Sequence, residues 1–283
     1  YQVEPAQQPA HSLAAIAGQT GHDETKLAEW VTAIERKGQA ILYGPPGTGK
    51  TFMAQQLARH LIGGGDGFSE LVQFHPSYAY EDFVQGIRPQ NEADGRLRYE
   101  LLNGRFLTFC QQAAQRNGRC VLIIDEINRA NLAAVFGELM YLLEYREATI
   151  PLAAGGRFAI PSNVRIIGTM NTADRSVALV DHALRRRFVF IHLPPNYDIQ
   201  HHFHAQTGYD PTPLERVLRR LNTQIDAPHY QLGITFFLQP NLASQLGSIW
   251  QMEIEPYLEE YFFDQPDLVN QFRWEQLKSS FEV

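Results

Sequence analysis

The segment that most constrains this chain is the glycine-rich stretch at residues 44–51, GPPGTGKT. It matches the pattern G-x-x-x-x-G-K-[ST], follows a short apolar run at 40–43 and precedes a helical stretch at 52–62. Glycines let the backbone turn tightly enough for successive N–H groups to face phosphate oxygens, and the next helix presents its positive end to the same charges. The sequence therefore predicts a strand, a phosphate-binding loop and a helix, in that order.

All eight residues of this loop are expected to contact a nucleotide. Lys50 is placed to reach the β- and γ-phosphates, and the Thr51 hydroxyl is placed to bind Mg²⁺. The alternative is a Gly/Pro-rich connection that only joins a strand to a helix, and the flanking context favours the phosphate loop. The candidate nucleotide contacts are Gly44, Pro45, Pro46, Gly47, Thr48, Gly49, Lys50 and Thr51.

Two acidic residues end the continuous apolar run at 120–124. Such a run is typical of a central parallel strand that is buried on both faces. Ligands of open α/β sheets bind at the carboxyl ends of the strands, so Asp125 and Glu126 are expected beside the phosphate loop. Asp125 would hold Mg²⁺ directly or through water, and Glu126 would polarise the attacking water as a general base. The alternative, two solvated acids at a strand end, fits poorly in a chain that also carries the phosphate loop.

Composition excludes several classes of protein. Apolar residues make up 44% of the 283 residues and charged residues 19%, which excludes a largely disordered chain. The net charge of -7 and the pI near 5.8 argue against a dedicated DNA-binding domain, so other parts would have to grip any nucleic acid.

Cysteine usage and hydropathy indicate a cytoplasmic protein. Cys110 and Cys120 show neither metal-ligand spacing nor a C-x-x-C pattern, so neither a disulfide framework nor a zinc site is expected. No apolar run approaches the ~20 residues of a membrane span, and no signal-peptide profile is present, so no membrane partner is expected. The sequence begins at Tyr1 rather than Met, which suggests a missing N-terminal part that could hold another domain.

Periodicity and turn residues predict the remaining elements. Residues 1–21 are rich in Ala, Gln and Pro and are expected to be a linker or tail. The stretches at 198–226 and 242–281 have the character of a small helical lid. Further helices are predicted at 25–37, 106–115 and 131–145, strands at 71–75 and 164–168, and hairpins around 94–95 and at 149–160.

Three histidines of the lid region, His201, His202 and His204, could be imagined as a metal site. No acidic partner or repeated spacing in the sequence supports that interpretation. An exposed polar helix face is predicted instead.

Three runs of sequence resemble the family of McrB, the AAA+ motor subunit of modification-dependent restriction systems. They are QFHPSYAYEDF at 73–83, DEINRAN at 125–131, and MNTADRS at 170–176 with DHALRRRF at 181–188. The resemblance is strong over about residues 39–195. The expected fold is a P-loop AAA+ doubly wound α/β parallel sheet over residues 22–195 with a second, smaller all-α lid domain over 196–283.

The resemblance also implies site roles. Asn171 corresponds to the AAA+ sensor that hydrogen-bonds the lytic water or the γ-phosphate, which suits a neutral amide that both donates and accepts. Asp174 and Arg175 could orient that sensor or bridge to a neighbouring subunit, or could form only a local ion pair. Arg186 first and Arg187 second are expected to act on the nucleotide of the next subunit, although cations at a helix end can also serve as caps.

Many AAA+ lids supply an arginine to the nucleotide, at a position expected within 232–235 here. This segment reads LGIT and contains no arginine, which puts that role in doubt.

The resemblance implies the function of an Mg²⁺-dependent GTPase or ATPase that forms a homo-oligomeric ring, expected to be a hexamer, and drives DNA translocation for a partner nuclease. The family is known for GTP, yet the N-K-x-D motif of small GTPases is absent. DNA cleavage would belong to a McrC-like nuclease subunit, since nothing in this chain resembles a nuclease site, and recognition of modified DNA would belong to the N-terminal domain. Alternatives are an AAA+ chaperone that remodels protein complexes and a nucleotide-dependent assembly module.

Overall fold

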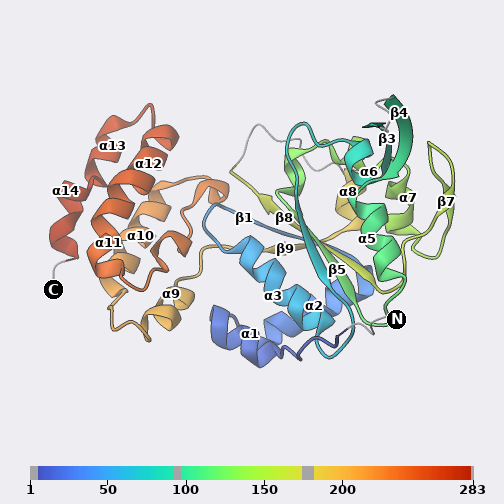
Figure 1. Cartoon of the computed structure of the whole chain (residues 1–283). Helices are drawn as coiled ribbons and strands as arrows, with labels where there is room; N and C mark the ends of the chain where they lie inside the picture. Colours follow the sequence, from blue (N-terminus) through green and yellow to red (C-terminus); the bar gives the residue numbers. More distant parts are fainter. Residues whose placement is uncertain (1–5, 92–96, 174–181, 282–283) are drawn as a thin grey trace.

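The computed structural model describes residues 6–91, 97–173 and 182–281, and in these the centre is a parallel sheet of five strands (Figure 1). The strand order is β2-β5-β8-β1-β9, and every pairing in this sheet is parallel. This arrangement confirms the predicted doubly wound α/β fold. The strands are β1 (Gln39–Gly44), β2 (Ser69–Gln73), β5 (Cys120–Asp125), β8 (Val164–Asn171) and β9 (Val189–His192).

Strand register brings the predicted site residues to one edge of the sheet. β1 pairs with β8 so that Gly44 lies opposite Asn171. β5 pairs with β8 with Ile124 opposite Gly168, so the next residues along, Asp125 and Thr169, are neighbours at the strand ends. The start of the phosphate loop, the acid and the amide therefore end adjacent strands at the same edge.

Strand side chains point alternately into two apolar cores, one on each face of the sheet. In β5, Leu122 and Ile124 belong to one core, and Val121 and Ile123 belong to the other. Figure 1 shows the helices of both layers. The first core contains residues of α5 (Arg105–Ala113), α6 (Leu132–Phe136), α7 (Leu139–Glu144) and α8 (His182–Arg187), and the second contains residues of α1 (Leu13–Thr20), α2 (Glu24–Lys37) and α3 (Lys50–Ile62).

The N-terminal segment forms a helix where a linker or tail was expected across residues 1–21. The Ser12 side chain caps α1 by accepting a hydrogen bond from the Ala15 N–H at 3.1 Å, and Gly21 ends the helix in the left-handed conformation. Ile16 is fully buried in the core that α1 shares with α2 and α3. The linker prediction is wrong for Leu13–Thr20. This segment is rich in Ala and Gln, so the short apolar face of the helix is not recognisable from its composition.

The single helix predicted at 131–145 is two helices, α6 and α7. Gly137 lies between them with φ 50° and ψ -129°, a conformation that side-chain-bearing residues rarely adopt. A Cβ at this position would also lie 3.0 Å from the Tyr80 ring. The prediction of one continuous helix is wrong because an isolated glycine inside a helical pattern is usually tolerated, and only the packing against Tyr80 shows that this one breaks the helix.

Both predicted hairpins form. β3 (Gln85–Asn91) pairs antiparallel with β4 (Leu97–Asn103) after the short helix α4 (Tyr80–Phe83), and their turn lies outside the described residues. β6 (Ile150–Pro151) pairs with β7 (Arg157–Phe158) around Gly155 and Gly156, which both have positive φ.

The described residues after β9 form a group of helices beside the sheet, drawn in orange and red in Figure 1. Their apolar core begins at Tyr197, whereas the cores that flank the sheet end at Leu193. On this ground we propose the boundary between the two domains at residues 195–196. The helices are α9 (Tyr197–His204), α10 (Thr212–Gln224), α11 (Leu242–Ile249), α12 (Glu255–Tyr261), α13 (Pro266–Gln271) and α14 (Trp274–Leu277).

Candidate active site

The glycine-rich loop joins β1 to α3, as predicted. Gly47 and Gly49 have φ of 73° and 79°, a left-handed backbone that glycine adopts without strain. Gly49 is the N-cap of the 13-residue helix α3, which begins at Lys50. The positive end of this helix is therefore directed at the loop, the arrangement that binds phosphate.

Lys50 folds back over the loop in this structure. Its Nζ donates to the backbone oxygen of Pro45 at 2.7 Å, and the Thr48 hydroxyl donates to the same oxygen at 3.0 Å. Burial lowers the pKa of Lys50 to about 8, against the opposing attraction of Glu126 and Asp125. An anionic phosphate beside the ammonium would favour its charged form.

Asp125 lies between two hydroxyl groups. Its Oδ1 accepts from the Thr51 hydroxyl at 2.7 Å and from the Thr169 hydroxyl at 2.6 Å. The Thr51 oxygen keeps its lone pairs for a cation because its proton is directed at the carboxylate. A hydroxyl oxygen and a carboxylate are the hard oxygen donors that Mg²⁺ prefers, so this pair fits the ion.

Glu126 has an unusual backbone. Its φ of 52° and ψ of 46° make it the non-glycine residue with positive φ among residues 6–91, 97–173 and 182–281. Its N–H donates to the Thr169 hydroxyl at 3.1 Å, and Arg129 Nε lies 3.5 Å from its Oε2. Such strained residues cluster at functional sites, where the surrounding contacts hold them.

Asn171 ends β8 beside the start of the phosphate loop. Its Oδ1 accepts from the Ala173 N–H at 3.3 Å, and its backbone oxygen accepts from the Asn128 side chain at 3.2 Å. The next residue, Thr172, donates its N–H to the Gly44 oxygen at 3.1 Å. The sensor candidate is therefore tied both to the loop and to the segment that follows the acids.

Sequence reasoning missed the roles of Thr169, Asn128 and Arg129. Thr169 contacts both acids, Asn128 supports Asn171, and Arg129 pairs with Glu126. A signal for Thr169 was present, because parallel strands that end in acids and in Thr-Met-Asn must meet at one sheet edge. Asn128 and Arg129 follow Glu126 in a short 3₁₀ turn, Ile127–Arg129, that periodicity does not predict.

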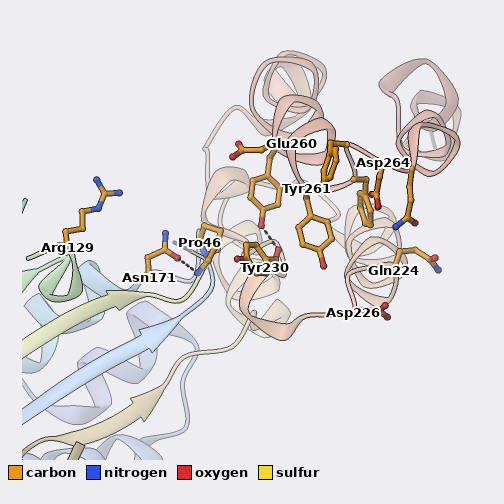
Figure 2. A pocket seen from close by; sticks show the side chains of 14 residues that line it. Pro46, Arg129, Asn171, Gln224, Asp226, Tyr230, Glu260, Tyr261 and Asp264 are labelled. Atoms are coloured by element: carbon orange, nitrogen blue, oxygen red, sulfur yellow. Dashed lines mark hydrogen bonds between the residues drawn. The ribbon is translucent and has the colours of Figure 1, made fainter. Parts of the chain in front are cut away.

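A cavity of about 870 Å³ opens beside this site, between the core and the lid (Figure 2). Pro46, Arg129 and Asn171 line it from the core, and Figure 2 shows residues of the lid such as Tyr230 and Tyr261 facing them. Thr51 and Asp125, the candidate Mg²⁺ ligands, do not line this cavity. The cavity therefore adjoins the site on the Asn171 side.

Comparison with known families identifies both parts of the chain. Residues 39–188 match the AAA domain of the dynein-related subfamily. Residues 213–270 match the alpha-helical lid domain of McrB. The chain belongs to the McrB family of AAA domains.

Two relatives of this McrB-family chain are components of restriction enzymes. It is 39% identical over 270 residues to the Type IV methyl-directed restriction enzyme EcoKMcrB subunit of Escherichia coli (strain K12). It is 29% identical over 192 residues to the Type II restriction enzyme BsuMI component YdiS of Bacillus subtilis (strain 168). The matches cover 86% and 54% of this chain and 58% and 56% of the relatives, so the chain spans somewhat more than half of their length.

The arginines of the family signature differ in their surroundings. Arg187 pairs with Glu144 at 3.0 Å and is mostly buried, whereas Arg185 lies over the Phe190 ring at 5.7 Å. Arg186 is exposed, with no ion pair to any residue that the structure describes. Asp174 and Arg175 lie outside the described residues.

The prediction of an exposed polar face for the lid histidines is wrong for His204, whereas His201 is exposed as predicted. His204 is buried and its ring contacts the Phe237 backbone oxygen and the Thr207 hydroxyl, both at 2.9 Å. His201 contacts Glu215 at 2.5 Å, an acidic partner from the next helix that sequence spacing did not show. His202 contacts the backbone oxygen of Gly18.

Two kinds of feature are absent from the described part of the chain. No group of three or more His, Cys, Asp or Glu side chains there is placed to hold a metal ion. Among the helices of that same part, none has the length and apolar character needed to cross a membrane.

Proposed function

We propose that this chain is an Mg²⁺-dependent nucleoside triphosphatase that hydrolyses GTP or ATP. The observation that carries the proposal is the hydrogen-bond chain from Thr51 through Asp125 and Thr169 to the backbone of Glu126. It joins the end of the phosphate loop to the candidate base through partly buried contacts. A solvated pair of acids would not need such support.

The eight loop residues would hold the phosphates, with Lys50 on the β- and γ-phosphates. Thr51 and Asp125 would hold Mg²⁺, which supplies charge stabilisation of the transferring phosphoryl group. Glu126 would accept a proton from the attacking water as Asn171 positions it.

Arg186 of a second copy would complete the site. In related phosphoryl transfer reactions, a guanidinium from a neighbouring protomer stabilises the charge of the transition state and raises the rate by about 10³–10⁵-fold. The exposure of Arg186 and the cavity beside Asn171 support this role, whereas the Glu144 contact of Arg187 makes it the second choice. Asp174 and Arg175 would orient Asn171 or bridge to the neighbour.

In the cell, the active unit would be a homo-oligomeric ring, a hexamer in our proposal. It would drive DNA translocation for a McrC-like nuclease subunit that cleaves the DNA. The names of both relatives, each a part of a restriction enzyme, support this assignment. DNA would be held by the complex or by another domain, since the net charge of this chain is -7.

Steady-state phosphate release tests the proposal. GTP and ATP are each supplied with Mg²⁺ or with EDTA, across a series of protein concentrations, to the parent and to Glu126→Gln. Release should need Mg²⁺, turnover per protomer should rise with concentration, and the variant should be at least about 100-fold slower because it lacks the base. The proposal would be contradicted by equal rates for the parent and the variant. It would also be contradicted if phosphate were released from neither GTP nor ATP at any protein concentration.

A further inference from the structure

One segment of the lid, residues 232–236, lies directly on the phosphate loop; we call it the lid strap. The Gly233 N–H donates to the Pro46 oxygen, and the Thr235 N–H donates to the Gly47 oxygen, each at 3.0 Å. The approach is close, because a Cβ on Gly233 would lie 2.0 Å from the Gly47 oxygen. The strap contains no arginine, and its hydrogen bonds to the loop come from its backbone and not from a charged side chain.

These two bonds set the direction of phosphate-binding groups. A trans peptide group points its C=O and its N–H in opposite directions. The Pro46 and Gly47 carbonyls share peptide groups with the N–H groups of Gly47 and Thr48. With both carbonyls held by the strap, both N–H groups are turned away from it, as a loop that cradles phosphate requires.

Side chains of the strap restrict the loop further. Phe236 covers Gly47, since a Cβ on that glycine would lie 2.6 Å from the ring. The Thr235 methyl group lies 3.6 Å from the position that a Cβ on Gly49 would take. The strap therefore covers Gly47 and lies close to Gly49, the two glycines whose left-handed conformation shapes the loop.

The buried side chain of Asn222, on α10, fixes the strap to the lid. Its Nδ2 donates to the Leu232 oxygen at 2.9 Å, and its Oδ1 accepts from the Leu232 N–H at 2.7 Å. Its Nδ2 also donates to the Tyr197 hydroxyl at 2.9 Å, at the start of the lid. The strap is therefore joined to α10 through a side chain that is only 7% exposed.

We infer that the lid strap senses bound nucleotide through the backbone of the phosphate loop, with Gly233 and Asn222 as positioning residues. The inference rests on the proposed function, since it takes the nucleotide to bind in this loop. Phosphate oxygens that accept from Gly47 and Thr48 would polarise the same peptide groups and strengthen their bonds to the strap. By linkage, docking of the strap then raises nucleotide affinity by the factor by which nucleotide tightens docking.

Gly233→Ala tests this inference. Gly233 is not among the glycines with positive φ, so alanine suits the backbone of the lid, while its Cβ pushes the strap away from Gly47. Equilibrium binding of non-hydrolysable GTP and ATP analogues should weaken about tenfold, the effect of losing one to two hydrogen bonds. Gly18→Ala is the matched control, because a Cβ there meets nothing within 4 Å, and it should bind as the parent does.

Two further measurements keep the test decisive if Gly233→Ala folds poorly. Phe236→Ala should weaken binding in the same direction without a buried clash. In the parent, hydrogen exchange at the Gly233 and Thr235 amides should slow when the analogue is added. Parent-like affinity in folded Gly233→Ala, or exchange that the analogue leaves unchanged, would overturn the strap inference alone. A parent that binds neither analogue would remove the proposed function together with it.

Discussion

The hydroxyl of Thr169 joins the metal side of the candidate site to its hydrolytic side. It donates to Asp125 and accepts from the backbone N–H of Glu126, whose left-handed conformation costs about 1–3 kcal/mol that the surrounding contacts must offset. A hydroxyl at this position thus orients two groups that would act on different atoms of the reaction.

Thr169→Val keeps the shape of the side chain and removes both hydrogen bonds. We expect kcat for nucleotide hydrolysis to fall about 10- to 100-fold, as small displacements of catalytic groups do, with a much smaller change in KM. Thr169→Ser, which keeps the hydroxyl, should retain most of the activity. The positioning role is wrong if the valine variant turns over at the parent rate.

At the scale of elements, Glu35 ties α2 to the sheet. It accepts from Arg119 Nε at 3.0 Å and from Arg165 Nη2 at 2.5 Å, and the Arg165 side chain on β8 is 8% exposed. Burial alone would raise the pKa of Glu35, but the hydrogen bonds from both arginines outweigh it and leave the pKa lowered.

Glu35→Gln should lower the free energy of unfolding by about 1–3 kcal/mol near neutral pH, because Arg165 loses its carboxylate partner. A lowered pKa in the folded state means that the stabilisation is fully present above the ordinary value of 4.5 and is lost as the pH falls through the folded value. Denaturant unfolding of both proteins at a series of pH values checks this. A stability difference that stays constant down to the lowest pH would contradict it.

Much of the core could be predicted from the sequence, because its signals are local. The phosphate loop carries its own pattern, and the run that ends in Asp125 is apolar on both faces. The break at Gly137, by contrast, depends on the Tyr80 ring, and the burial of His204 depends on the Phe237 backbone. Such contacts join residues far apart in the chain, and periodicity within one segment contains no information about them.

In the whole molecule, three parts contribute to the candidate site. The sheet edge brings together the phosphate loop and the acids, the lid strap contacts the loop from the other side, and Arg186 is exposed at the end of α8, where we propose that it acts on another copy. Under the proposed function, a site built in this way would be complete only in an assembly, because closed rings repeat one interface from copy to copy.

A mixing experiment checks whether the arginine of one protomer acts at the nucleotide of its neighbour. Glu126→Gln protomers keep Arg186 but lack the base, and Arg186→Ala protomers keep the base but lack the arginine. Each protein alone should hydrolyse GTP and ATP at least about 100-fold more slowly than the parent. Mixed in equal amounts, they should recover activity at roughly a quarter of the sites, where an intact base meets a neighbour's arginine. A mixture no more active than its components would contradict the account.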